Sequence, residues 1–157
     1  MNKKVFLKLA EDYNVIPVYE RITGDMLTPV LAFLKLREKD KFCFLLESVE
    51  GIGRLARYSF IGKDPHKIIS NRSKQLTVIS NNGKEEIKQN IFDYLKHEIA
   101  SYKFPTIEDI PDFTGGIVGY IGYENIALIE EKLEFENHEN SETPDSILGV
   151  FNTIIAF

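Results

Sequence analysis

The chain has 157 residues, 43% hydrophobic and 27% charged, which is the composition of one globular domain of ordinary size. Its formal net charge of −5 argues against a nucleic-acid-binding surface, because such surfaces are usually basic. No stretch approaches the roughly 18 apolar residues of a membrane span, and charged residues interrupt the N-terminal apolar stretch. The single cysteine, Cys43, lies in an apolar run and is expected to be a buried, structural thiol. We therefore expect a cytoplasmic protein that binds neither nucleic acid nor membrane.

The first third of the chain predicts two helices with a strand between them. Apolar residues at helical spacing predict an amphipathic helix over residues 3–12. The alternation in VIPVYERI predicts a strand over 15–22, whose proline suggests an edge or a bulge. Thr28 followed by Pro29 is typical of a helix N-cap and first helical position, and the apolar face of that helix continues to Arg37.

Several short strands follow, separated by turn signals. Apolar runs and alternation predict strands over residues 42–48, 57–62, 66–70, 75–79 and 84–88. The dipeptide Asn82-Gly83 predicts a tight type I′ hairpin turn between the last two of them.

The last third predicts a helix over residues 91–99 and a proline-containing loop over 103–114. The stretch GGIVGYIGYENIALIE then predicts a glycine-rich strand that runs into a short helix. An acidic loop over 130–146 leads to a final strand over 146–157. Helices interspersed with hairpin-like strands predict an α+β fold with mostly antiparallel sheets. Because an apolar strand that stops at Phe157 would leave an unpaired edge, we expect the chain to be part of a longer polypeptide.

The glycine-rich stretch does not have the spacing of a nucleotide-binding motif. Gly116, Gly119 and Gly122 read G-x-x-G-x-x-G, which is neither the dinucleotide fingerprint nor a P-loop. Such glycines favour close packing against another sheet, or bulges. Tyr120 and Tyr123 are expected to pack, with their hydroxyl groups on polar partners.

The other titratable groups show no spacing typical of a metal or catalytic site. His66, His97 and His138 are scattered and are expected at the surface. The acidic run 130–142 lacks the alternating pattern and the fixed glycine of a calcium loop, so a solvated loop is expected.

The polar groups after residue 46 raise a more specific possibility. The apolar strand ends in Glu47 and Ser48, and Arg54 and Arg57 follow after a glycine-spaced link. A carboxylate can pair with an ammonium group, a hydroxyl can donate or accept, and arginine binds a carboxylate in bidentate fashion. These groups suit a free amino acid, although a surface ion pair is the alternative.

Three segments carry a resemblance to a known family: VIPVYERITGDMLTPVLAFLKL, LLESVEGIGRLARYSFIGKDP and GGIVGYIGYENIALIE. In this order the chain resembles the N-terminal region of anthranilate synthase component I, and the similarity covers nearly the whole chain. The most specific elements are LLES, RYSFIGKDP and GGIVGYIGY. Aminodeoxychorismate synthase component I shares much of this region and is the alternative within the family.

The resemblance implies the function of the complete family member, a lyase. That enzyme converts chorismate to anthranilate, using ammonia from a glutamine amidotransferase subunit, component II, and a magnesium ion. The chorismate and magnesium site belongs to a C-terminal catalytic part that residues 1–157 do not match. The resemblance therefore implies an N-terminal regulatory region that is inactive by itself and holds no cofactor. It also implies two orthogonally packed antiparallel sheets with helices outside, in an α/β/β/α arrangement.

In this family the N-terminal region carries most of the feedback site for L-tryptophan. Carried over by motif, the resemblance assigns Leu46, Glu47, Ser48 and Arg57 to that site. A proline-tyrosine segment of the C-terminal part would complete the pocket. A non-enzymatic module that docks the glutamine amidotransferase is the alternative from a different functional class.

Overall fold

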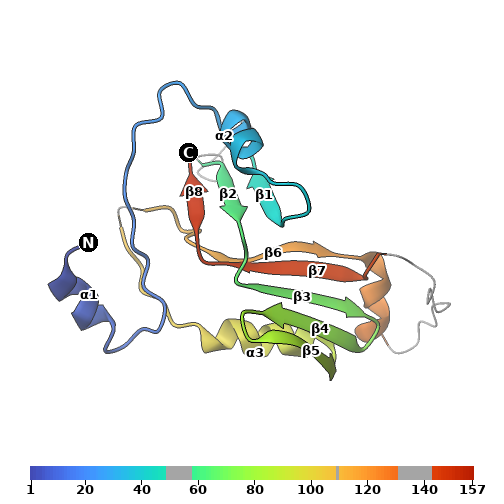
Figure 1. The fold of residues 1–157 in the computed structure, drawn as a ribbon. Helices are drawn as coiled ribbons and strands as arrows, with labels where there is room; N and C mark the ends of the chain where they lie inside the picture. Colours follow the sequence, from blue (N-terminus) through green and yellow to red (C-terminus); the bar gives the residue numbers. More distant parts are fainter. Residues whose placement is uncertain (49–57, 109, 131–142) are drawn as a thin grey trace. The chain divides into compact units, whose positions relative to one another are not determined.

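The chain folds as two compact units, each built around its own antiparallel sheet (Figure 1). The computed structural model describes residues 1–48, 58–108, 110–130 and 143–157. The first unit consists of residues 1–63, 97–114 and 153–157, and the second of residues 64–96 and 115–152. The predicted α+β class and antiparallel pairing are confirmed, because every strand pair in both sheets is antiparallel. The predicted orthogonal packing of the two sheets stays a prediction.

The first unit contains a three-stranded sheet in the order β1-β2-β8. Its elements are α1 (Lys3–Leu9), α2 (Pro29–Leu36), β1 (Cys43–Leu46), β2 (Phe60–Lys63) and β8 (Ile154–Ala156). The helix α2 packs against β1 and β2 (Figure 1). It buries Ala32, while Ile61 of β2 is only 1% exposed. This sheet positions the residues that the sequence assigns to a ligand site.

The second unit contains a five-stranded sheet in the order β5-β4-β3-β7-β6. Its strands are β3 (Lys67–Arg72), β4 (Gln75–Ser80), β5 (Gly83–Lys88), β6 (Gly116–Ile121) and β7 (Ser146–Phe151). The helix α3 (Ile91–Ser101) begins in this unit, and the 3-10 helix η1 (Tyr123–Leu128) follows β6. The buried apolar residues of the unit are Ile69, Leu76, Val78, Ile91, Leu95, Leu148, Val150 and Phe151.

Several local predictions are confirmed by specific contacts. Thr28 caps α2, because its Oγ1 accepts a hydrogen bond from the backbone N–H of Leu31 at 3.2 Å, and Pro29 is the first helical residue. The described part of the 102–115 connection contains no helix or strand, as predicted for a loop. The short helix predicted after the glycine-rich strand is η1.

The strand predicted over residues 15–22 is wrong. Asn14 and Val15 donate backbone hydrogen bonds to the carbonyl of Lys103, at 3.1 and 3.0 Å, but residues 15–22 form no strand. Pro17 lacks the N–H group that a strand ladder requires at that position, and apolar alternation alone does not supply a pairing partner.

The turn between β4 and β5 also differs from its prediction. The hairpin exists, but its two-residue loop is Asn81-Asn82, and Ser80 pairs with Gly83. A type I′ turn needs positive φ at both central residues, whereas both asparagines have negative φ. The positive φ, +115°, falls on Gly83, the first residue of β5.

The strand predicted over residues 146–157 is two strands that belong to different sheets. β7 pairs with β3 and β6, and β8 pairs with β2. The two strands are separated by Asn152 and Thr153, the only polar pair in an otherwise apolar stretch. The hydrophobic stretch therefore indicated strand structure without showing where the chain leaves the first sheet.

A buried polar network joins three segments at one end of the five-stranded sheet. Asn71 of β3, Asn125 of η1 and Ser146 of β7 are each at most 2% exposed. Asn71 Nδ2 donates to Asn125 Oδ1 at 2.8 Å. Asn125 Nδ2 in turn donates to Ser146 Oγ and to the backbone carbonyls of Gly122 and Asp145, at 3.0 to 3.1 Å. The two N–H groups of one amide are therefore shared among three oxygen atoms.

We predict that the second unit loses stability when Asn125 loses its donor group. Asn125→Ala should lower the free energy of unfolding by roughly 1–3 kcal/mol, because the buried Asn71 Nδ2 and Ser146 Oγ each lose a partner. Asn125→Asp should cost more, since it places a buried anionic acceptor against other oxygen atoms. Urea denaturation followed by circular dichroism measures both. Asn81→Asp, in the exposed β4–β5 turn, is the matched control and should change little. Equal unfolding midpoints for Asn125→Asp and Asn81→Asp would contradict the role of the network.

Candidate functional site

The register of the three-stranded sheet determines which side chains share a face. Phe44 lies opposite Gly62, and Leu46 lies opposite Phe60. Directly opposed residues point to the same side of a sheet, and successive residues alternate. Phe44, Leu46 and Phe60 therefore share one face, which we call the aromatic face, while Ile61 lies on the other.

Four rings pack together on the aromatic face, and we call them the aromatic cluster: Phe44, Tyr58, Phe60 and Phe113. The Phe113 ring meets Phe60 edge to face, with centroids 5.1 Å apart, and meets Phe44 at 6.5 Å. The Tyr58 ring is tilted against Phe60 at 6.0 Å. Such aromatic pairs are worth about 0.5–1.5 kcal/mol each beyond the area that they bury. Periodicity could not have indicated Phe113, because it lies in an irregular connection.

Gly62 makes room for this cluster. A Cβ atom built on Gly62 would lie 2.2 Å from Cε1 of the Phe44 ring, far inside van der Waals contact. The absence of a side chain at Gly62 therefore allows the opposed Phe44 ring to lie over β2. A glycine in a short apolar strand is the sequence signal for such a close approach.

Three of the four residues assigned to a ligand site lie at the exposed end of β1. Leu46 is the last residue of the strand and is 45% exposed, and Glu47 and Ser48 follow it, both exposed. Extending the register by two residues places Ser48 opposite Tyr58. The Ser48 hydroxyl donates a hydrogen bond to the Tyr58 carbonyl oxygen at 2.6 Å, in agreement with that register. Arg57, like Arg54, lies outside the described residues.

The three residues differ in their relation to the strand. Leu46 is the last residue of β1 and lies on the aromatic face, whereas Glu47 and Ser48 follow the end of the strand. Glu47 is exposed to solvent just beyond the end of β1, which is an edge strand of this sheet. The site thus presents a hydroxyl and a carboxylate beside a half-open apolar surface.

Comparison with known proteins gives one consistent result. The chain is 39% identical to anthranilate synthase component 1 of Acetivibrio thermocellus over 123 residues, which cover 78% of this chain and 25% of that protein. It is 35% identical to the Synechocystis component 1 over 153 residues, 97% of this chain and 30% of that protein. The crystal structure of anthranilate synthase component I from Streptococcus pneumoniae has a TM-score of 0.51 and 30% identity, covering 89% of this chain and 29% of that one. No protein-family model matches the chain.

The chain belongs to the anthranilate synthase component 1 family. It spans about 25–30% of the length of the relatives described above. These relatives carry the name of an enzyme component, and the resemblance stated from the LLES, RYSFIGKDP and GGIVGYIGY motifs is confirmed. The individual roles of Leu46, Glu47, Ser48 and Arg57 stay predictions.

The described residues of this family member do not fit the magnesium ion that the resemblance implies for the complete enzyme. They contain no group of three or more histidine, cysteine, aspartate or glutamate side chains that could hold a metal ion. The acidic run lies mostly in residues 131–142, outside the described part of the chain. Every helix of the described residues is too short or too polar to cross a membrane.

The predictions for single side chains have mixed outcomes. His97 is exposed, as predicted, but His66 is half-buried and its Nδ1 has no hydrogen-bond partner among the described residues. His138 lies outside the described residues. Cys43 is half-buried rather than buried. The Tyr120 hydroxyl donates to the Pro144 carbonyl at 2.7 Å, as expected, and the Tyr123 side chain is 77% exposed.

The glycine-rich strand makes a close approach, but within its own sheet. A Cβ atom on Gly119 would lie 2.0 Å from the carbonyl oxygen of Ile147 in the neighbouring strand β7. Gly115 and Gly116 have φ of +152° and +140°, which only glycine adopts readily. These glycines allow close contact between β6 and β7, and their predicted packing against another sheet stays a prediction.

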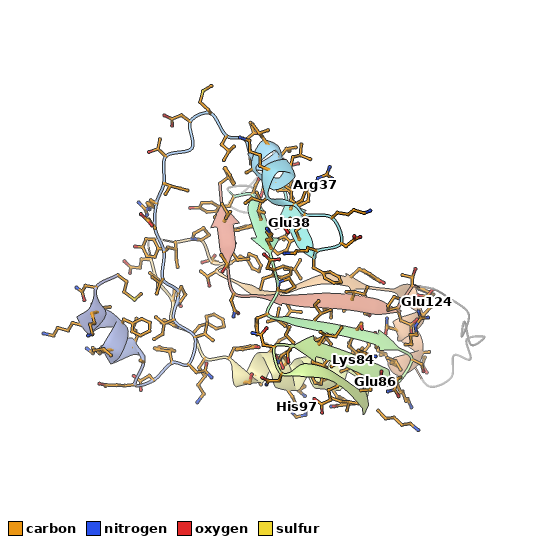
Figure 2. All side chains as sticks on the ribbon, in the orientation of Figure 1. Arg37, Glu38, Lys84, Glu86, His97 and Glu124 are labelled. Atoms are coloured by element: carbon orange, nitrogen blue, oxygen red, sulfur yellow. The ribbon has the colours of Figure 1, made fainter. Side chains whose placement is uncertain are left out.

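An ion cluster lies at the other end of the β1–β2 pair from Ser48. Glu38, which is labelled in Figure 2, pairs with Lys63 of β2 and with Lys41, the latter at 3.0 Å. The hydrogen bond from Lys63, with that from Lys41, lowers the pKa of Glu38 from 4.5 to about 2. This cluster ties the segment after α2 to β2 and lies away from the candidate site.

We predict that Gly62→Ala disrupts the aromatic cluster. The new methyl group would collide with the Phe44 ring, and overpacking of this kind typically costs about 1–3 kcal/mol. Urea denaturation and the near-ultraviolet circular dichroism of the aromatic residues would both report the change. Gly24→Ala is the control, because a Cβ atom there meets nothing within 4 Å. Identical behaviour of the two variants would show that the Phe44 ring does not depend on Gly62.

We predict that the Glu38 ion cluster contributes to stability only above acidic pH. Because folding lowers the pKa of Glu38 from 4.5 to about 2, its contribution is complete above pH 4.5 and is lost as pH falls toward 2. The urea midpoints of the wild type and of Glu38→Gln should therefore differ at pH 7 and converge near pH 2. Since both partners are partly exposed, 1 M salt should reduce the difference at pH 7. A difference that is constant from pH 7 to 2 would contradict this assignment.

Proposed function

We propose that this chain is the N-terminal, L-tryptophan-binding part of an anthranilate synthase large subunit. The observation that carries the proposal is similarity to component 1 chains over 97% of this chain in one relative, supported by a solved component I structure. The motif LLES lies at an exposed strand end, where a small ligand can reach it. The proposal concerns binding and regulation by this region.

The polar groups at the end of β1 suit the ammonium group of an amino acid. A serine hydroxyl has one donor and two acceptor lone pairs, and Ser48 already donates to the Tyr58 carbonyl. Its remaining capacity toward a ligand is therefore as an acceptor, like that of the Glu47 carboxylate. Two acceptors, one of them anionic, favour a cationic donor. We place the ammonium group of tryptophan beside Glu47 and Ser48, and its carboxylate beside a cation, the role proposed for Arg57.

The aromatic face suits the other end of the ligand. Leu46 and Tyr58 are 45% and 40% exposed, so an apolar surface adjoins the two polar groups. Transfer of an indole ring onto such a surface contributes through apolar burial, at about 25 cal/mol per Å². A ligand that joins an ammonium group to an aromatic ring fits this arrangement better than a purely polar one.

The complete enzyme would convert chorismate to anthranilate, as a lyase that receives ammonia from a glutamine amidotransferase subunit, component II. The catalytic residues and the magnesium ion would belong to the part of the family that this chain does not match, so this chain alone should be inactive. Tryptophan would act by binding more tightly to a low-activity arrangement of the complete subunit and so populating it. The expected location is the cytoplasm, where chorismate and glutamine are available.

Tryptophan binding can be measured directly, because the chain contains no tryptophan of its own. The fluorescence anisotropy of L-tryptophan should rise to saturation as protein is added, and L-phenylalanine should displace it only at a much higher concentration. Ser48→Ala and Glu47→Gln should each weaken binding about tenfold, since a hydrogen bond to a charged group is worth roughly 1.5–3 kcal/mol.

The matched controls are Ser101→Ala and Glu85→Gln, which change the same residue types outside the LLES motif. They should bind tryptophan like the wild type. An anisotropy that stays flat for this chain would overturn the proposal that it binds tryptophan by itself. Capture of the glutamine amidotransferase subunit without tryptophan binding would instead favour the docking module.

A further inference from the structure

One aromatic ring of the connection between α3 and β6 packs on the aromatic face. Phe113 belongs to no helix or strand, yet its side chain contacts two rings of the sheet. The interplanar angles are 77° with Phe60 and 63° with Phe44, so both contacts are edge to face. This geometry requires an aromatic edge and is not reproduced by an aliphatic side chain.

The same cluster continues to the candidate site. The Phe60 ring contacts the Tyr58 ring at 6.0 Å, and the Tyr58 carbonyl accepts the Ser48 hydroxyl. Tyr58 lies just outside β2, so these two contacts hold it in addition to its neighbours in the chain. A series of contacts therefore links Phe113 to Ser48. The Phe113 ring contacts Phe60, the Phe60 ring contacts Tyr58, and the Tyr58 carbonyl accepts a hydrogen bond from Ser48.

The open part of the aromatic face lies at the Tyr58 end. Phe113 occupies the surface over Phe44 and Phe60, both half-buried, whereas Leu46 and Tyr58 are exposed. An aromatic ligand whose ammonium group is held by Glu47 and Ser48 would reach this exposed surface first. The tilt of the Tyr58 ring then decides which ring shapes can stack on it.

We infer that Phe113 is a positioning residue for ligand selectivity: through Phe60 it sets the Tyr58 ring on which the side chain of the bound amino acid rests. The inference rests on the proposed function, because it concerns the same site. It adds two residues, Tyr58 and Phe113, to those that the LLES motif indicates. The inference also implies that the α3–β6 connection responds when a ligand binds at the site.

The substitution Phe113→Leu separates a positioning role from mere space filling. Leucine keeps an apolar side chain in place but removes the aromatic edge. Phe104→Leu is the matched control, since Phe104 lies in the same connection, is 60% exposed and joins no ring pair among the described residues. Circular dichroism would first establish that both variants are folded.

The first measurement uses the protein without ligand. In NMR spectra, with assignment by Tyr58→Phe, the ring resonances of Tyr58 should shift in Phe113→Leu and stay unchanged in Phe104→Leu. An unshifted Tyr58 ring in Phe113→Leu would overturn the inference, whether or not tryptophan binds.

The second measurement is the tryptophan titration, repeated with L-phenylalanine as competitor. Phe113→Leu should weaken tryptophan binding roughly three- to tenfold, the equivalent of one aromatic contact. It should also lower the ratio of tryptophan to phenylalanine affinity, which a loss of stability alone would leave unchanged. Wild-type affinity and ratio in Phe113→Leu would overturn the inference while the proposed function stands. No binding by the wild type would overturn the proposed function, and the role of Phe113 in selectivity with it.

Discussion

The pairing of β1 with β2 is the constraint on which the candidate site depends. Because Phe44 lies opposite Gly62, its ring can lie over a strand that offers no side chain at that point. A slip of one residue would turn Leu46 away from the aromatic face. The same register brings the Ser48 hydroxyl to the Tyr58 carbonyl. Ring packing at one end of the pair and a hydrogen bond at the other therefore support a single alignment.

The second unit is held together by a different combination of interactions. Its sheet buries aliphatic residues such as Ile69 and Leu148, but one end is closed by the amides of Asn71 and Asn125. Buried polar groups of this kind are costly when unpaired, so they specify one arrangement of η1 against the sheet rather than simply adding stability. The role of this network is to fix the framework of β3, β7 and η1.

Membership of the anthranilate synthase component 1 family indicates a function for the end of β1 that the chemistry of its residues alone does not specify. A glutamate and a serine at the end of an edge strand are common at protein surfaces, and most such groups bind nothing. In this chain the hydroxyl is oriented by the Tyr58 carbonyl, and an exposed aromatic surface adjoins it. Directional acceptors beside an apolar surface suit an amino acid with a large side chain.

The sequence by itself determined the features that depend on neighbouring residues. Thr28 and Pro29 start α2 through local hydrogen bonding, and the LLES motif identified the family and three described candidate residues. The tertiary structure decided everything that depends on partners far along the chain. It placed Phe113 on the aromatic face, divided residues 146–157 between two sheets and left residues 15–22 without a strand. Apolar alternation indicates that a side chain can be buried. The residues against which it packs are determined only by strand pairing and by packing between segments far apart in the chain.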